Sequence, residues 1–258
     1  MHDDTLHAIA SALIDARRSG VAADETPWKD TPITSDDAYA VHDEVAAALG
    51  WNTEPQLPTH WKGGGPTPTS TAVFARLPGP WVQSSPGQLA VRDFHRLGIE
   101  IEVAFRLARD VTAEDLAARG THDAAALLDA MAVSIELVDF RWQGADHAPG
   151  MLKLADLQSN GALVVGDWTP IRSVDWAAQT AVLQIDGREV GRYQGAHPCG
   201  DPRWMAPQWL QHAMLRQGWL PAGSVLTTGS WCGMVWLDGP ARVDAVFEGI
   251  GEARLTLG

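Results

Sequence analysis

The stretch Leu97-Gly98-Ile99-Glu100-Ile101-Glu102-Val103-Ala104-Phe105 alternates apolar and acidic residues over its central part. In an extended strand, successive side chains point to opposite faces with a period of two. The two isoleucines would then share one face, and Glu100 and Glu102 would share the other. Two carboxylates about 4 Å apart repel each other by roughly 4 kcal/mol at an effective dielectric of about 20. Either a bound divalent cation, which prefers oxygen ligands, or exposure to water at a sheet edge would relieve that repulsion.

The composition describes an ordinary globular protein with an excess of acidic residues. The chain has 258 residues, of which 45% are hydrophobic and 20% are charged, and 19 basic against 32 acidic residues give a net charge of −13. This charge argues against a nucleic-acid or anionic-membrane partner. The sequence contains no apolar run of the length that a membrane span needs, and residues 1–4 are acidic where a secretory signal would be basic. We therefore predict a cytoplasmic protein in which an anionic substrate would need a local metal ion, lysine or arginine.

The periodicity of the chain predicts an α+β fold with a mixed, mostly antiparallel sheet and flanking helices. Helical spacing and end signals predict helices over residues 3–19, 36–49, 123–132 and 206–217. Short apolar runs predict strands at 99–108, 133–138, 162–165, 224–228, 234–237, 241–247 and 252–256, and Asp186-Gly187 predicts a hairpin turn between residues 181–185 and 188–193. Residues 51–87, rich in Pro, Thr and Gly, are expected to be loop with one short strand at 73–77. Residues 1–80 would form a helical and loop region that packs on a β-rich catalytic region, residues 81–258. The two regions together would form one structural unit.

Glu136 interrupts the otherwise apolar run at residues 133–138. A lone buried carboxylate is costly unless it is paired or coordinated. One interpretation pairs Glu136 with an arginine such as Arg141. The other joins it to Glu100 and Glu102 in a three-carboxylate site, whose oxygen donors would suit Mg²⁺ or Mn²⁺ and not zinc.

Several ordered segments of this chain resemble signatures of the fumarylacetoacetate hydrolase superfamily. Residues 98–104 resemble the family's Glu-x-Glu strand, and residues 134–141 resemble the strand that carries its third carboxylate. Further segments that are similar to family signatures are 155–156, 161–166, 223–230 and 249–251. Residues 38–42 and the lysine-glycine loop at 60–64 resemble the branch that contains 2-keto-4-pentenoate hydratases and 4-oxalocrotonate decarboxylases. The resemblance extends from about residue 36 to the C-terminal end, and its specificity comes from the order and spacing of the motifs together.

The resemblance implies a sheet roll of the fumarylacetoacetate hydrolase type, a homo-oligomer, and a Mg²⁺ or Mn²⁺ site formed by Glu100, Glu102 and Glu136. The implied activity is hydration of a 2-hydroxy-dienoate or 2-oxo-enoate acid, as in the catabolism of aromatic compounds. One alternative is decarboxylation of a 4-oxalocrotonate-like 2-oxo diacid on the same scaffold, and another is a divergent keto-acid-binding member of low activity. Carbon–carbon hydrolysis usually needs an additional Glu–His pair to activate water, and no such pair stands out in the sequence.

The lysine-glycine loop and Asp156 provide further candidate residues. The resemblance implies that Lys62 is a second cation, which binds the substrate carboxylate or moves a proton. Gly63 and Gly64 would let the backbone approach a ligand closely. Asp156 is expected to act as an acid or base, to orient a ligand from outside the site, or to be a structural turn residue; Lys153 could pair with it.

Three later residues complete the expected site, and two positions depart from the family pattern. The hydroxyl groups of Thr228 and Ser230 are candidates for substrate contacts, and His197 is a minor candidate in a loop. Leu157 replaces the amide of an Ala-Asp-Asn signature, and Thr69 lies where an acidic residue often precedes the next strand. These departures leave the metal site intact and put the proton-transfer step in question.

Overall fold

The computed structural model describes residues 2–51, 59–119 and 124–258. Within these ranges nine strands form one sheet with β2-β1-β13-β5-β7-β8-β3 as its main order, while β14 pairs with β5 and β9 pairs with β7. The bounds are β1 (His60–Gly64), β2 (Val73–Leu77), β3 (Val82–Ser84), β5 (Leu97–Leu107), β7 (Leu128–Asp139), β8 (Asn160–Val165), β9 (Thr169–Pro170), β13 (Val225–Thr227) and β14 (Val235–Trp236). Strands from both ends of the chain therefore share this sheet, and β1 comes to lie beside β13.

A second sheet of five strands has the order β11-β10-β15-β16-β4, and a small pair joins β12 to β6. Their bounds are β4 (Gly87–Leu89), β6 (Val111–Thr112), β10 (Thr180–Ile185), β11 (Arg188–Gln194), β12 (Trp219–Leu220), β15 (Ala241–Phe247) and β16 (Gly251–Leu257). Among the described strands, the pairs β1–β13, β3–β8 and β4–β16 are parallel and the others are antiparallel. The predicted mixed, mostly antiparallel fold with flanking helices is confirmed.

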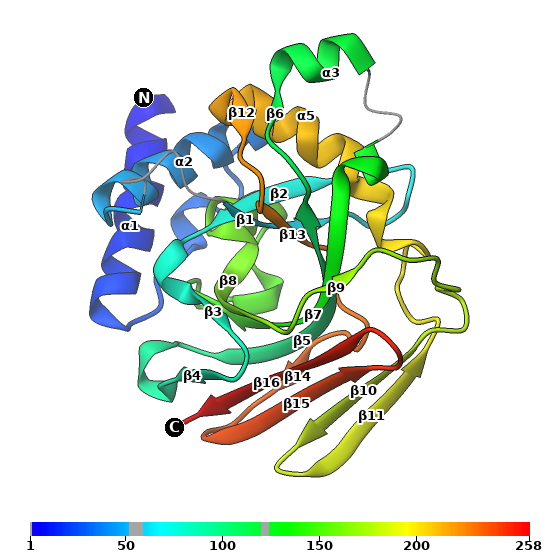
Figure 1. Cartoon of the computed structure of the whole chain (residues 1–258). Coiled ribbons are helices and arrows are strands. Elements are labelled where there is room, and N and C mark those ends of the chain that lie inside the picture. Colours follow the sequence, from blue (N-terminus) through cyan, green and yellow to red (C-terminus); the bar gives the residue numbers. More distant parts are fainter. Residues whose placement is uncertain (1, 52–58, 120–123) are drawn as a thin grey trace.

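The helices lie at the opposite end of the molecule from the five-stranded sheet (Figure 1). They are α1 (His2–Ser19), α2 (Ser35–Ala48), α3 (Ala113–Arg119), α4 (Gly150–Ala155) and α5 (Ala206–Gln217). Thr34 begins α2 with a capping box, in which its hydroxyl accepts from the Asp37 amide and the Asp37 carboxylate accepts from the Thr34 amide. No helix in the described part of the chain is both long and apolar enough to cross a membrane.

The apolar face of β5 forms the centre of the core. Ile99, Ile101 and Val103 are fully buried in one cluster with residues of the five-stranded sheet such as Phe247 and Leu255. Burial of each large aliphatic side chain contributes about 1.5–3 kcal/mol, so this face fixes the orientation of β5. The alternate face, which carries the glutamates, must then point away from the five-stranded sheet.

Two local predictions need correction. Residues 128–132, predicted as part of a helix over 123–132, form the start of β7, and 124–127 form a single short 3-10 turn; Asp123 lies outside the described residues. The alanine-rich composition favours a helix, but pairing with β5, for example of Ala132 with Ala104, overrides that preference. Residues 60–64, predicted as loop, form β1, which pairs with both β2 and β13.

Candidate metal centre

Three glutamates meet on the face of β5 and β7 that points away from the five-stranded sheet. Glu100 lies opposite Glu136 in the antiparallel register, and Glu102 is two residues further along β5. One carboxylate oxygen from each of the three lies within 4.8 Å of the others. Glu102 is 2% exposed and Glu136 is fully buried, so water does not screen their repulsion. The structure thus brings together the three carboxylates that were proposed from the sequence as metal ligands.

Neighbouring side chains hold one oxygen of Glu136 and leave the other without a partner. Lys62 Nζ donates to Glu136 Oε1 at 2.5 Å, and Asn160 Nδ2 donates to the same oxygen at 3.0 Å. Glu136 Oε2 is buried and has no hydrogen-bond partner among the described residues. A buried anionic oxygen without a donor is costly, and coordination of a cation removes that cost. The partner of Glu136 is therefore Lys62, whereas Arg141 pairs with other residues.

Glu102 is oriented from the neighbouring strand β13. The Thr227 hydroxyl donates to Glu102 Oε2, and the Ser134 hydroxyl, 2.9 Å from Thr227 Oγ1, completes a short chain of hydrogen bonds. Both hydroxyl-bearing residues are fully buried. Three carboxylates with one buried, unpartnered oxygen form a donor set that suits a hard divalent cation such as Mg²⁺, Mn²⁺ or Ca²⁺.

The same crowding shifts the pKa values of the glutamates. Burial and the charge of Glu136 raise the pKa of Glu100 to about 8 and that of Glu102 to about 7. Burial alone would lower the pKa of Lys62, but the facing carboxylates of Glu136 and Glu100 raise it above its ordinary value. In the metal-free protein, near neutral pH, part of the acidic site therefore carries protons that a bound cation would displace.

The raised pKa values predict that the metal-free protein loses stability as the pH rises. The folded state retains protons on Glu100 and Glu102 above pH 4.5, the ordinary value, whereas the unfolded state releases them. The contribution of these two carboxyls to stability is therefore full below pH 4.5 and is lost as the pH rises through the folded-state values of about 7 and 8, by about 1 kcal/mol per pH unit for each proton. We expect the thermal midpoint in a chelator to fall between pH 6.5 and 8.5, and saturating Mg²⁺ to remove most of this fall, as measured by calorimetry.

The buried His42 and the partly buried His212 set the lower limit of the pH range in which this fall in stability appears. Burial lowers the pKa values of His42 and His212 to about 4, which makes stability rise with pH up to about 6.5 and no further. The matched variant is Glu102→Gln, which should show a flatter decline above pH 6.5 because one titrating carboxyl is removed. Equal slopes in the two proteins would show that Glu102 does not titrate in this range.

Lys62 and its glycines lie on β1, beside β13. Lys62 pairs in register with Thr227 of β13, which places its ammonium group among the glutamates. A Cβ atom on Gly63 would lie 2.5 Å from Met205 Sδ and 2.8 Å from the Phe74 ring, so this position requires glycine. A Cβ on Gly64 would meet only the side-chain oxygen of Gln158, at 3.5 Å, an ordinary contact. Gly64 therefore lies beside the site and is not constrained by packing.

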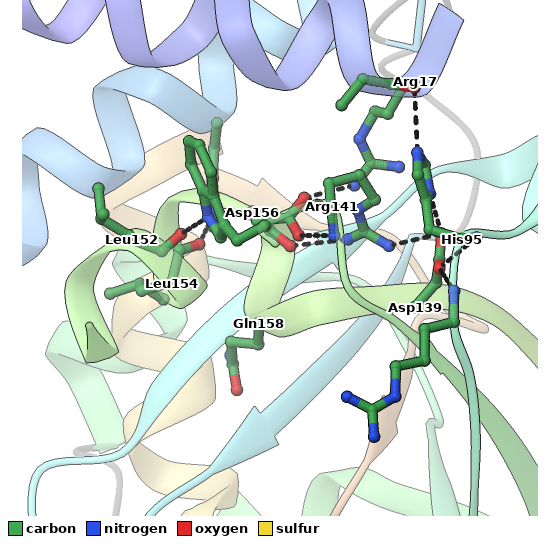
Figure 2. Close-up of polar contacts among 12 residues, drawn as sticks. Arg17, His95, Asp139, Arg141, Leu152, Leu154, Asp156 and Gln158 are labelled. Atoms are coloured by element: carbon green, nitrogen blue, oxygen red, sulfur yellow. Dashed lines mark hydrogen bonds and ion pairs between the residues drawn. The ribbon is translucent and has the colours of Figure 1, made fainter. Parts of the chain in front are cut away.

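Asp156 lies in a buried network of charges, shown in Figure 2. Its Oδ1 atom accepts from Arg141 Nε at 2.7 Å and from Arg17 Nη2 at 3.1 Å, and its Oδ2 atom accepts from the Arg141 amide at 3.3 Å. Asp139 also approaches Arg141, at 3.3 Å, and Lys153 instead donates to the Asp146 carbonyl. Both carboxylate oxygens of Asp156 are occupied, so the geometry favours an orienting or structural role over that of an acid or base.

Beyond Asp156, the chain presents Gln158 to Lys62. Leu157, Gln158 and Ser159 have φ values of 53°, 53° and 60°, in the left-handed region that side chains other than glycine rarely adopt. This backbone directs the Gln158 carbonyl oxygen to Lys62 Nζ, 3.1 Å away, and Gln158 Nε2 is buried without a partner among the described residues. Gln158 and Asn160 were not foreseen as site residues. The sequence did contain an indication for Asn160, because a polar residue stands there at the start of an apolar strand.

The remaining candidates lie at the turn that follows β13. His197 is buried; its Nδ1 accepts from the Cys199 amide at 3.3 Å and its Nε2 donates to the Thr228 carbonyl at 2.9 Å, which assigns a neutral ring. Burial accordingly lowers the pKa of His197. The Thr228 hydroxyl donates to the Val103 carbonyl at 2.7 Å, and the Ser230 hydroxyl donates to the Gly233 carbonyl at 2.8 Å. These donors hold the turn beside Glu102, and their predicted contacts with a substrate remain predictions.

The fold is a mixed sheet with flanking helices, and its central strands carry three carboxylates that could hold a metal ion. The profile of the family described as "Fumarylacetoacetate (FAA) hydrolase C-terminal" matches residues 50–257, and the chain belongs to this family. A curated relative, the 2-keto-4-pentenoate hydratase of Burkholderia vietnamiensis, is 34% identical over 163 residues. That alignment covers 61% of this chain and 59% of the relative, so it spans less than two thirds of the relative's length.

Solved structures share the fold over most or nearly all of the chain. The 4-oxalocrotonate decarboxylase from Pseudomonas putida G7, complexed with magnesium and adipate, superposes with a TM-score of 0.81 at 17% identity and covers 99% of this chain and 98% of its own. The 5-carboxymethyl-2-hydroxymuconate delta-isomerase from Mycobacterium smegmatis gives a TM-score of 0.57 at 16% identity over 78% of this chain and 79% of its own. At these identities the similarity establishes the fold and not the reaction.

Proposed function

We propose that this protein is a divalent-metal-dependent lyase that adds water to a 2-hydroxy-dienoate or 2-oxo-enoate acid. The observation that carries the proposal is the convergence of three buried carboxylates with one unpartnered oxygen, Glu136 Oε2. The 34% identity to a 2-keto-4-pentenoate hydratase supports this choice of reaction. A cytoplasmic location and a homo-oligomeric state are proposed with it.

We propose Glu100, Glu102 and Glu136 as the ligands of Mg²⁺ or Mn²⁺. Lys62 and Asn160 hold Glu136 Oε1, which leaves Oε2 free to face the cation. When bound, the cation supplies a Lewis acid for the carboxylate and C2 oxygen of the substrate, where negative charge develops. Thr227 orients Glu102 for the same purpose through its hydroxyl group.

The protein's own residues would bind and orient the acid beside this centre. Lys62 places a second positive charge among the glutamates, where it attracts a carboxylate into a chain of net charge −13. The buried Gln158 amide offers an unused donor that an acceptor oxygen of the substrate would satisfy. Burial of Glu102 and Glu136 excludes bulk water, which strengthens each of these interactions.

Decarboxylation of a 2-oxo diacid is the second candidate function. The decarboxylase with a TM-score of 0.81 was solved with adipate, a dicarboxylic acid. In this chain, Lys62 Nζ donates to the Gln158 backbone carbonyl, and the Gln158 side-chain amide carries an unused donor; we propose that both groups bind the second carboxylate.

A dienol absorbance assay with parallel CO₂ measurement tests both reactions. With Mg²⁺ present, we expect a 2-hydroxy-dienoate to lose its chromophore without release of CO₂, and we expect no turnover in a chelator. Release of CO₂ in proportion to consumption of a 2-oxo diacid would instead assign decarboxylation. If no member of a panel of both acid types is consumed with Mg²⁺ or Mn²⁺, the enzymatic proposal is wrong and a binding role remains.

A further inference from the structure

A second pocket lies behind the strand that carries Lys62. In the β1–β2 register, Lys62 pairs with Ala75, whereas Trp61 pairs with Arg76 and Gly63 with Phe74. Because side chains alternate along a strand, Trp61, Phe74 and Arg76 point to the face opposite to Lys62 and the glutamates. This face and residues of α2 and α5 enclose a cavity of about 310 Å³. The pocket therefore lies across β1 from the candidate metal centre, and Leu157, which precedes the site residue Gln158, also lines it.

Several aromatic and imidazole rings line this pocket. The His212 ring lies 4.6 Å from the Tyr39 ring, 5.4 Å from the Phe74 ring and 5.8 Å from the Trp61 ring, measured between centroids. Burial lowers the pKa of His212 to about 4, so its ring is neutral at pH 7. Flat rings of this kind bind planar apolar groups by stacking and edge-to-face contacts.

The pocket wall carries two cations, Arg76 and Arg216, which differ in their partners. The Arg216 guanidinium pairs with Asp43 and also donates to the Tyr39 carbonyl. Arg76 also lines the pocket, and no hydrogen bond or ion pair to it is found among the described residues. Burial lowers the pKa of Arg76, and the charge of Asp43 offsets only part of that effect. A partly desolvated guanidinium without a counter-ion is unfavourable, and a carboxylate that binds it in a bidentate manner removes the penalty.

We propose that this pocket is a second ligand site, specific for a planar aromatic or conjugated monocarboxylate, with the carboxylate on Arg76 and the ring against Trp61 and Phe74. A molecule the size of benzoate fits a cavity of about 310 Å³. Trp61 and Lys62 are consecutive residues of β1, so an occupant contacts the strand that positions Lys62. The site does not depend on the metal or on the reaction proposed above.

Benzoate is the probe, and calorimetric titration in a chelator is the measurement. We expect saturable binding that raises the thermal midpoint, with at least tenfold weaker affinity for benzamide, which keeps the ring and lacks the charge. Arg76→Gln should weaken benzoate binding at least tenfold. The control Arg92→Gln, at a side chain that is 88% exposed, should leave the affinity unchanged.

A second variant separates this pocket from the metal centre. Glu102→Gln should retain full benzoate affinity, because the side chain of residue 102 lies on the same face of the sheet as Lys62, opposite to the pocket. Benzoate binding that requires Mg²⁺ or is lost in Glu102→Gln would place the ligand at the metal centre and overturn the proposal. Unchanged affinity in Arg76→Gln, or no saturable binding at millimolar benzoate, would overturn it as well.

Discussion

Replacement of Glu102 by glutamine is expected to weaken Mg²⁺ binding by about 100-fold or more and to abolish metal-dependent turnover. Glu102 is 2% exposed and is held by Thr227, so its carboxylate cannot be replaced by a neighbouring side chain. An amide oxygen carries no full charge and is a much weaker ligand for a hard cation. Loss of a group that merely supports a metal ligand typically costs 10–100-fold in affinity, so loss of a ligand should exceed that range. Calorimetric titration with Mg²⁺ measures the affinity without reference to activity.

The fold of this variant should remain intact. Glutamine has nearly the same shape, and the substitution removes one of three mutually repelling charges, so the metal-free variant should be at least as stable as the parent near pH 8. Glu114→Gln, at an exposed glutamate of α3, is the matched control and should leave Mg²⁺ affinity unchanged. Equal Mg²⁺ affinity in Glu102→Gln and the parent protein would refute the three-carboxylate site.

Replacement of Asp156 by asparagine is expected to destabilise the protein by about 3–5 kcal/mol. The change leaves Arg17 and Arg141 buried beside one remaining carboxylate, that of Asp139, in place of two. Breaking a buried ion pair by removal of one partner has a cost of this size because the surviving charge stays desolvated. In a chain of this length we expect the thermal midpoint to fall by about 6–20 °C, as measured by calorimetry.

The test also decides whether Asp156 takes part in the chemistry. If Asp156 holds the backbone at residues 157–159, activity per folded molecule should persist at low temperature and fall as the variant unfolds. Asp129→Asn is the matched control, because Asp129 also accepts two hydrogen bonds from an arginine, Arg106, but is exposed. The control should change stability by less than about 1 kcal/mol. A catalytic role would instead appear as lost turnover with an unchanged thermal midpoint.

Local patterns in the sequence predicted much of the fold. Helix α5 begins and ends where Pro207 and Gly218 predict, and the Asp186-Gly187 turn joins β10 to β11 as expected. These features depend on residues a few positions apart, whose preferences act within one turn of the chain. The prediction over 123–132 was wrong because local preference there favours a helix, while the paired neighbour β5, more than 20 residues earlier, imposes a strand.

The residues of the candidate metal centre also divide into those that local patterns predicted and those that depend on contacts between distant strands. Alternation in β5 placed Glu100 and Glu102 on one face, and the interrupted run at 133–138 identified Glu136. The sequence did not show that β1 exists, that Lys62 would bond to Glu136 across 74 positions, or that the Gln158 carbonyl would hold that lysine. Such contacts depend on the register between distant strands, which no local pattern encodes.

By itself the sequence determined which residues share a face, because side-chain direction in a strand follows from the period of two alone. It therefore determined that Glu100 and Glu102 share one face of the strand and that the apolar residues share the opposite face. Only the tertiary structure decided the partners of the other buried charges, with Lys62 on Glu136 and with Arg17 and Arg141 on Asp156. A buried charge must find its counter-charge in space, and the fold brings together Lys62 and Glu136 across 74 positions and Arg17 and Asp156 across 139.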